Sequence, residues 1–188
     1  MRFFITFAYD GSKYSGYQKQ PKQKTIQGEI EKALKQINDN KEVSLVASGR
    51  TDAGVHAYNQ RAHFDLETKI TPEKLKMGLN SLIPDDIYVK KVFEVDKDFH
   101  ARFNVKAKEY IYKINMGMYN PIEKDYIYQY NKKLDIPEME RALKYLEGTH
   151  DFRSFVKIDE EKVKDYFQSL IDNKVFFIFS KYFRKSLI

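Results

Sequence analysis

The amino-acid sequence predicts an α+β fold, with helices on one side of a mostly antiparallel sheet. Two segments have the apolar period of an amphipathic helix, and each begins directly after a threonine, Thr25 or Thr71. The segments around them are rich in Phe, Ile and Val, or alternate between apolar and polar residues, as half-buried strands do. The order β-α-β-β-α-β, followed by a further strand and helix, is typical of layered α+β domains. The uncovered face of such a sheet is free to hold a ligand.

The N-terminal residues predict a strand, a loop and a helix, in that order. Residues 2–9 predict the strand, and Asp10-Gly11 marks the turn that ends it. The polar residues 12–24 predict the loop. Thr25 is the expected N-cap of the helix, and the Asn-Asp-Asn run at 38–40 ends it. The apolar face of this helix consists of Ile26, Ile30, Ala33, Leu34 and Ile37.

Two more strands and the loop between them follow this helix. Residues 43–47 predict a short apolar strand, and residues 48–57 a loop that contains two glycines. Residues 58–66 alternate between two kinds of side chain, which predicts a strand with one polar face. We expect Gln60, Ala62, Phe64 and Leu66 on one face, with Asn59, Arg61, His63 and Asp65 on the polar face.

The remaining elements are a helix, two strands and a second amphipathic helix. Pro72 suits the first position of the helix, where its missing N–H costs nothing, and Pro84 ends that helix. Its buried stripe is expected to be Leu75, Leu79 and Leu82. Two strands are predicted next, at residues 87–95 and 105–116. A helix closed by Gly148 is predicted at residues 136–146, and a further strand could begin at residues 175–178. We expect two units, 1–104 and 105–188.

The charge balance is basic, with 33 Lys+Arg against 27 Asp+Glu, a net charge of +6 and 15% aromatic residues. Such a surface suits nucleic acid, because phosphates pair with cations and unstacked bases stack on rings. A chain rich in Lys and Tyr is, however, also common in AT-rich bacterial genomes whatever its function. Candidates for phosphate contacts are Lys13, Lys19, Lys22, Lys24 and Arg102, each of which could equally be a solvated surface charge.

Several classes of protein are disfavoured by what the sequence lacks. It contains no cysteine, which rules out disulfides and thiolate chemistry and fits a reducing cytoplasm. The four histidines share no close ligand spacing, so we expect no metal. The sequence has no glycine-rich phosphate loop followed by Lys-Ser or Lys-Thr, so we do not expect nucleotide hydrolysis. Neither a signal peptide nor an apolar run of membrane-spanning length is present. We therefore expect a soluble cytoplasmic protein.

The segment Ser-Gly-Arg-Thr-Asp-Ala-Gly-Val-His-Ala at 48–57 carries the most chemical information. Gly49 and Gly54 allow tight main-chain geometry and the close approach of a ligand. Arg50 and Asp52 lie two residues apart, so that the arginine can orient the carboxylate or keep it ionised. An aspartate between glycines is also an ordinary turn former that bonds its own main chain, and spacing alone favours that interpretation.

The run 49–57 is similar to the catalytic signature of the TruA-type tRNA pseudouridine synthase family. Further segments that resemble this family occur in the expected order over residues 1–157. They are Tyr9-Asp10-Gly11 with Tyr14, Gly16, Tyr17 and Gln18, where Tyr17 replaces a frequent Trp; Thr25-Ile26-Gln27-Gly28; Asn80, Leu82 and Pro84; Phe99-His100-Ala101-Arg102-Phe103 with Lys108-Glu109-Tyr110-Ile111-Tyr112; and Gly148-Thr149-His150-Asp151-Phe152 with Ser154-Phe155.

The resemblance implies the pseudouridine synthase fold, in which two ferredoxin-like units join their sheets edge to edge with a cleft between them. It also implies an isomerase that converts uridine to pseudouridine at tRNA positions 38 to 40, in the anticodon arm, without a metal or small-molecule cofactor. A uridine inside a stem must first leave the stack. The family further implies a homodimer whose subunits share each tRNA.

Three residues match the active-site residues of the family. Asp52 matches the catalytic aspartate, which acts as a nucleophile or as a base. Arg50 matches the neighbouring arginine, which can pair with Asp52 and fill the space that the flipped base leaves. Tyr110 matches a tyrosine that stacks on the uracil ring, although its position alone would make it an ordinary strand aromatic.

Beyond Gly148 the likeness to the family weakens. The family continues with a segment similar to Gly-Asn-Gly-Phe-Leu-Arg-Asn-Met-Val-Arg, and here Arg184 aligns with its first arginine while Ile188 aligns with its second. We therefore expect a family member that stops early, with an incomplete second unit. The alternative function is a truncated, catalytically impaired tRNA-binding relative. A generic RNA-recognition sheet is disfavoured, because no Gly-Phe-Gly-Phe-Val motif is present.

Overall fold

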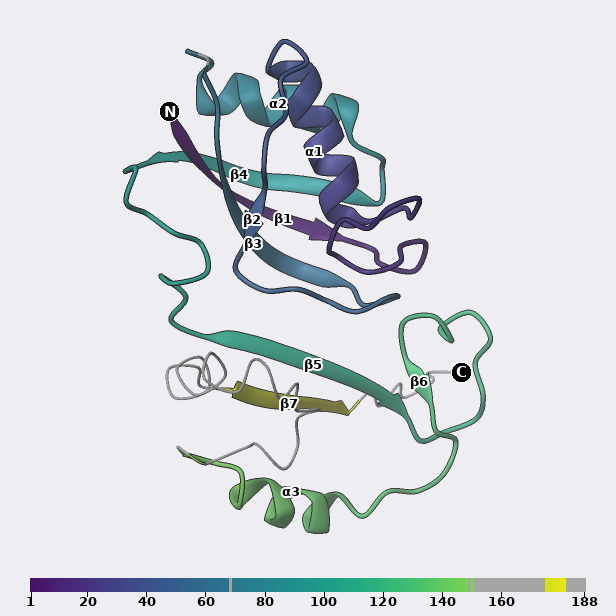
Figure 1. Ribbon diagram of the computed structural model, residues 1–188. Helices are drawn as coiled ribbons and strands as arrows, with labels where there is room; N and C mark the ends of the chain where they lie inside the picture. The colour runs from purple at the N-terminus through teal and green to yellow at the C-terminus, as the bar shows by residue number, and fades with distance from the viewer. Residues whose placement is uncertain (68, 149, 151–174, 182–188) are drawn as a thin grey trace. The chain divides into compact units, whose positions relative to one another are not determined.

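The computed structural model describes residues 1–67, 69–148, 150 and 175–181 (Figure 1). The chain divides into two compact units, Met1–Val105 and Lys106–Ile188. Within the described residues, no helix is long and apolar enough to cross a membrane.

The first unit contains one four-stranded sheet and two helices. Its elements are β1 (Arg2–Tyr9), α1 (Ile26–Ile37), β2 (Val46–Ala47), β3 (Ala57–Asp65), α2 (Pro72–Leu82) and β4 (Ile87–Val95). The strand order is β2-β3-β1-β4, and every neighbouring pair is antiparallel. The predicted element order and the antiparallel sheet are confirmed for this unit.

Both helices of the first unit begin at the threonines that the sequence indicates. The hydroxyl of Thr25 accepts a hydrogen bond from the N–H of Gly28, and that of Thr71 accepts one from Lys74. Each bond satisfies one of the main-chain donors that a helix leaves unpaired in its first turn. α1 ends at Asn38, and Asp39 and Asn40 then adopt positive φ angles of 50° and 63°. The predicted helix start and stop signals are therefore confirmed.

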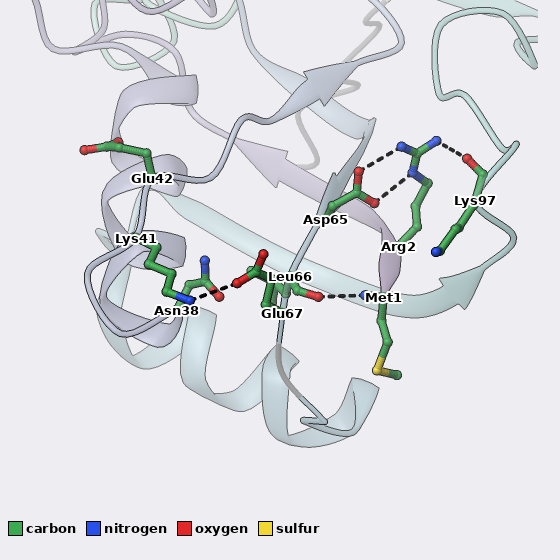
Figure 2. Close-up of a pocket in the computed structure, with 9 residues that line it drawn as sticks. All are labelled: Met1, Arg2, Asn38, Lys41, Glu42, Asp65, Leu66, Glu67 and Lys97. Atoms are coloured by element: carbon green, nitrogen blue, oxygen red, sulfur yellow. Dashed lines mark hydrogen bonds and ion pairs between the residues drawn. The ribbon is translucent and has the colours of Figure 1, made fainter.

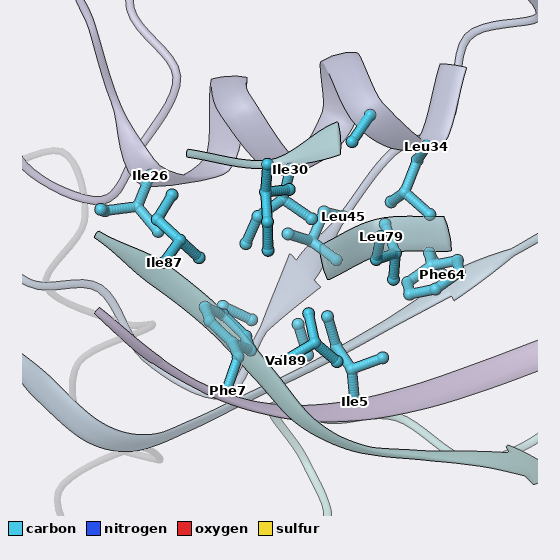
Figure 3. Packing of buried hydrophobic residues seen from close by; sticks show 14 of the residues in the cluster. Ile5, Phe7, Ile26, Ile30, Leu34, Leu45, Phe64, Leu79, Ile87 and Val89 are labelled. Carbon is cyan, nitrogen blue, oxygen red and sulfur yellow. The ribbon is translucent and has the colours of Figure 1, made fainter. Parts of the chain in front are cut away.

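α1 and α2 lie over the same face of this sheet, and the hydrophobic core lies between these two helices and the sheet (Figures 1 and 3). Alternate side chains of β1 point into the core, and Phe3, Ile5 and Phe7 are fully buried. The main side chains that meet them are Ile26, Ile30, Leu34, Leu45, Phe64, Leu75, Leu79, Ile87 and Val89. Burying each large apolar side chain contributes about 1.5–3 kcal/mol, so the packing of the helices holds the sheet in its register.

β2 is shorter than the sequence predicts, because only Val46 and Ala47 pair with β3 instead of the whole of 43–47. The main chain of Leu45 is bound by side chains of α1. Its N–H donates to Glu31 Oε1 at 3.1 Å, and its carbonyl accepts from Gln27 Nε2 at 3.2 Å. Two side chains of the helix thus replace the ladder bonds at this position.

Two residues of the first unit differ in burial from what their place in the pattern suggests. His63 lies opposite the core face of β3, as predicted, but it is only 4% exposed, because the segment after β4 lies against it and brings the ring of Phe99 to within 6.4 Å. Leu82, expected in the buried stripe of α2, is 44% exposed. It is the last residue of that helix, whereas Leu75 and Leu79 are fully buried as expected. Gln60, Ala62, Phe64 and Leu66 are all buried, as predicted.

The second unit contains β5 (Lys108–Asn115), β6 (Tyr128–Gln129), α3 (Ile136–Lys144) and β7 (Val175–Lys181). Its strand order is β6-β5-β7, and both described pairings are parallel. The prediction of a mostly antiparallel sheet therefore does not hold for these pairs. α3 begins at Asp135, whose carboxylate accepts from the N–H of Glu138, and the predicted closing residue Gly148 has a φ of 97°. The resemblance segment at 151–155 and the aligned residues Arg184 and Ile188 lie outside the described residues.

Candidate active site

Asp52 lies in the loop that connects β2 to β3, and we call residues 48–56 the Asp52 loop. The main chain turns directly after Asp52, because the N–H of Val55 donates to the Asp52 carbonyl at 3.2 Å and Gly54 adopts a φ of 77°. The side chains of Arg50 and Asp52 are both exposed. The structure records no ion pair between these two side chains in the described part of the chain. Both functional groups therefore face solvent, where a ligand can reach them.

The segment that follows β1 holds the Asp52 loop from one side. The N–H of Gly54 donates to the Tyr14 carbonyl at 3.4 Å. Gly11 packs so closely against the loop that a Cβ at this position would lie 2.1 Å from the carbonyl oxygen of Val55. Only glycine allows that approach. The resemblance motif at 9–18 is therefore packed directly against the loop that carries Asp52.

His56 connects the end of the loop to the turn after β1. Its Nδ1 lies 3.0 Å from Asp10 Oδ1 and 3.3 Å from the main-chain nitrogen of Gly11. Asp10 Oδ1 also accepts from the N–H of Ser12 at 2.9 Å and from its hydroxyl at 2.6 Å. The carboxylate thus fixes its own turn and the last residue of the Asp52 loop together.

Two buried polar side chains contact the loop from the sheet. The Tyr9 hydroxyl lies 2.8 Å from the hydroxyl of Thr51, and the amide of Gln60 donates to the Gly49 carbonyl at 3.1 Å. Neither residue was predicted to be part of the site. The available signal was that Gln60 is a polar residue at a position of β3 whose neighbours on the same face are apolar.

The candidate phosphate contacts differ in how far their charges are already paired. Lys19 lies 3.0 Å from Glu31, and Lys24 lies 3.9 Å from Asp86 and 4.5 Å from the centre of the Tyr14 ring. A phosphate would have to compete with these partners. The side chains of the other candidates are exposed, namely Lys13, Lys22 and Arg102.

Tyr110 belongs to the second unit, where it lies in β5 opposite Phe177 of β7 in the main-chain register. Its side chain is 42% exposed, which is more than a strand residue in a closed core would show. Arg50 and Asp52 thus share one loop of the first unit, whereas Tyr110 belongs to a strand of the second.

A pocket of about 520 Å³ lies at the opposite end of β1 from the Asp52 loop (Figure 2). Its charged groups neutralise one another: Arg2 pairs with Asp65 at 2.8 Å, and Lys41 pairs with Glu67 at 2.8 Å. The amino terminus of Met1 donates to the Leu66 carbonyl at 2.7 Å. Because these groups already pair with one another, a ligand would have to break an existing pair in order to bind in this pocket. In the described residues, no group of three or more His, Asp or Glu side chains is arranged to hold a metal ion.

The chain was compared with known protein families and with known proteins. The family model described as tRNA pseudouridine synthase matches residues 5–104. This range begins within β1 and includes every later helix and strand of the first unit. The chain is 48% identical to tRNA pseudouridine synthase A of Geobacillus sp. (strain WCH70) over 155 residues, which cover 82% of this chain and 62% of the relative.

Two further relatives carry the same name. Identity to the protein of Anoxybacillus flavithermus is 45% over 174 residues, covering 93% of this chain and 70% of the relative. Identity to the protein of Lacticaseibacillus casei is 43% over 171 residues, covering 89% of this chain and 69% of the relative. The alignments thus span between three-fifths and seven-tenths of the length of these relatives. This chain belongs to the tRNA pseudouridine synthase family.

Proposed function

We propose that this chain is a tRNA pseudouridine synthase that isomerises uridine to pseudouridine at positions 38 to 40, in the anticodon arm of tRNA. Membership of the family supports the reaction class. The observation that carries the proposal is the exposed carboxylate of Asp52 on a loop whose main chain is bound on both sides, by Tyr14 and by Gln60. A reactive group must reach its substrate yet keep one position, and this arrangement provides both.

The reaction is an internal rearrangement. The bond between N1 of uracil and C1′ of ribose breaks, the base turns, and a bond forms between C5 and C1′. The proton on C5 is lost while N1 gains one, so neither an oxidant nor a reductant is required. Asp52 serves as the nucleophile or as the base, and either role needs an ionised carboxylate.

Arg50 and Tyr110 complete the proposed site. Arg50 occupies the space that the target base leaves when it flips out of the stack, for which an exposed cation two residues from Asp52 is suited. Tyr110 stacks on the flipped uracil ring, and its partial exposure in β5 leaves a ring face available.

We also propose the finer features of the family for this chain. The first unit, residues 1–104, is a ferredoxin-like unit that carries the Asp52 loop, and its strand order β4-β1-β3-β2 supports this. Residues 105–188 form a second α+β unit, whose described strand pairs are parallel. The working protein is a cytoplasmic homodimer that binds tRNA and requires neither a metal nor a small-molecule cofactor.

The test is pseudouridine formation in a tRNA whose anticodon arm carries uridine at position 38, 39 or 40, measured together with tRNA affinity. Asp52→Asn keeps the size of the side chain and removes its charge. Asp98→Asn is the matched control, since Asp98 is an exposed carboxylate near the start of β1. We expect turnover to vanish only in Asp52→Asn, with tRNA affinity unchanged.

The other outcomes separate the alternatives. Binding without turnover in the wild type would support a catalytically impaired tRNA-binding relative. Equal turnover in the wild type and in Asp52→Asn would refute the role of Asp52. Modification of uridines outside the anticodon arm would refute the proposed substrate position while leaving the reaction class intact.

A further inference from the structure

We infer that Tyr9 and Gln60 are positioning residues that set the location of Asp52 through the main chain on its N-terminal side. The inference rests on the proposed function of Asp52. Neither residue touches the substrate in this account. They act from inside the core of the first unit on Ser48, Gly49 and Thr51, which are three of the four residues that precede Asp52.

Gln60 holds the beginning of the Asp52 loop with every polar group of its amide. Its Oε1 accepts from the Ser48 hydroxyl at 2.9 Å and from the N–H of Arg61 at 3.1 Å. Its Nε2 donates to the Gly49 carbonyl at 3.1 Å. The N–H of Arg61 can only donate and the carbonyl of Gly49 can only accept, so the amide has one satisfactory orientation.

Tyr9 holds the loop on the other side of Arg50. Its hydroxyl lies 2.8 Å from Thr51 Oγ1, and the side chain is only 4% exposed. Burial raises the pKa of Tyr9, whereas its hydrogen bonds to Thr51 and Gln60 lower it. The three side chains therefore form one polar chain beneath the loop, and the phenol stays protonated at neutral pH.

This chain of bonds matters because the Asp52 carboxylate is held only through the main chain around it, to which Tyr14 and residue 17 also bond. Its side chain is exposed, and no hydrogen bond or ion pair of its carboxylate is recorded in the described part of the chain. The position of the carboxylate is consequently inherited from the main chain of residues 49–51. A displacement of about 1 Å in a reacting group can cost about a hundredfold in rate, so small shifts of these residues are consequential.

Tyr17 provides a matched control for Tyr9. Its ring centre lies 6.5 Å from that of Tyr9, and its side chain is 2% exposed in the same core. The Tyr17 hydroxyl is buried and has no hydrogen-bond partner among the described residues. The main-chain N–H of residue 17 donates to the Thr51 carbonyl at 3.0 Å, a bond that any non-proline residue retains. Removing the Tyr17 hydroxyl thus changes the core but not the polar chain.

The first experiment compares Tyr9→Phe with Tyr17→Phe in pseudouridine formation. We expect Tyr9→Phe to lower kcat about tenfold with KM for tRNA within about twofold, because the loop is displaced while the binding surface is kept. Tyr17→Phe should leave both constants unchanged. Equal effects of the two substitutions, or a change confined to KM, would overturn the inference.

The second experiment uses Gln60→Glu, which has the same shape but presents an oxygen to the Gly49 carbonyl. When ionised, this carboxyl cannot donate to that carbonyl; when protonated, it can. Burial raises the pKa of a carboxyl, so this side chain should take up its proton at a higher pH than a solvent-exposed glutamate does. The ionisable groups on the neighbouring elements are Tyr9 on β1, Arg50 and Asp52 in the loop and Arg61 on β3.

For Gln60→Glu we expect kcat relative to the wild type to be low at about pH 8 and to recover as the pH falls towards about 6. A purely structural loss would give a ratio that does not change with pH, and that result would overturn the role of Gln60. Thermal unfolding of each variant, measured in parallel, confirms that the assays compare folded proteins.

Hydrogen exchange of the Asp52 loop separates this inference from the proposed function. Exchange at residues 48–52 should be faster in Tyr9→Phe than in Tyr17→Phe. If the wild type forms no pseudouridine, the proposed function fails, and the exchange rates alone decide whether the pair holds the loop. If the wild type is active and Asp52→Asn is not, unchanged kcat and unchanged exchange in Tyr9→Phe would overturn the inference alone.

Discussion

The Nδ1 of His63 accepts a hydrogen bond from the main-chain N–H of Ala101, 3.1 Å away. An imidazole nitrogen can accept only when it carries no proton. Burial, together with the nearby His100 and Arg2, lowers the pKa of His63, while Asp65 acts in the opposite direction. A neutral histidine on β3 therefore binds the segment after β4 to the face of the sheet that the two helices do not cover.

We predict that the first unit loses stability as the pH falls from about 6.5 through the lowered pKa of His63. The unfolded state binds the proton near the usual value of 6.5, whereas the folded state binds it only at lower pH. The stabilisation is therefore complete above about pH 6.5 and is lost below it. Urea unfolding at several pH values measures this loss. His63→Gln should reduce the pH dependence without abolishing it, because the pKa of His100 is lowered as well. An unchanged slope in His63→Gln would contradict the assignment.

Glu31 is predicted to be far more important for stability than the ion pair it forms suggests. Glu31→Ala leaves the buried N–H of Leu45 without its acceptor and removes one of the two acceptors of the Gln27 amide, so we expect a loss of about 2–4 kcal/mol in the free energy of unfolding. Lys19→Ala removes only the exposed partner and should cost less than about 1 kcal/mol. Chemical denaturation of both variants tests this, and similar losses would show that the ion pair is the main contribution.

Two glycines should respond in opposite directions to replacement by alanine. Gly11→Ala would place a Cβ 2.1 Å from the Val55 carbonyl, so we expect a loss of about 1–3 kcal/mol and reduced pseudouridine formation. Gly78→Ala lies within α2, where the new Cβ would meet Ile37 Cδ1 at an ordinary 3.5 Å. That substitution should stabilise the protein by about 0.5–1 kcal/mol. Melting temperatures that shift in the same direction would refute this assignment.

Tyr17→Phe is predicted to stabilise the protein by about 1 kcal/mol. The hydroxyl of Tyr17 is buried, and among the described residues it finds no partner, so it loses its bonds to water without replacement. Tyr9→Phe should instead lower stability by about 1 kcal/mol, since it deletes a satisfied bond. Unfolding curves of the two variants give the comparison, and a destabilised Tyr17→Phe would point to a partner for this hydroxyl.

Features encoded by neighbouring residues are the ones that the sequence predicts well. The caps at Thr25 and Thr71 use a donor three residues ahead, and the buried face from Gln60 to Leu66 follows from strict alternation. The signature around Asp52 is likewise contiguous. In each case the chemistry lies within one turn of helix or one run of strand, so a short window of sequence contains all of it.

Features that depend on distant residues could not be predicted in this way. The shortening of β2 results from Glu31, fourteen residues before Leu45, and the burial of His63 results from Ala101, thirty-eight residues after it. The support of the Asp52 loop is similar, because Tyr9 lies forty-two residues before Thr51. No local pattern distinguishes such a tyrosine from the other aromatic residues of a core strand.

The way the Asp52 loop is held also restricts its length. Surface loops usually accommodate inserted or deleted residues, because their main chain is bound only at the two ends. Here the chain is tied at Gly49, Thr51 and Gly54, and a side chain at residue 11 would already collide with it. An added residue would shift Asp52 relative to at least one of these contacts. Although the loop is exposed, its length is therefore as restricted as that of a strand in the core.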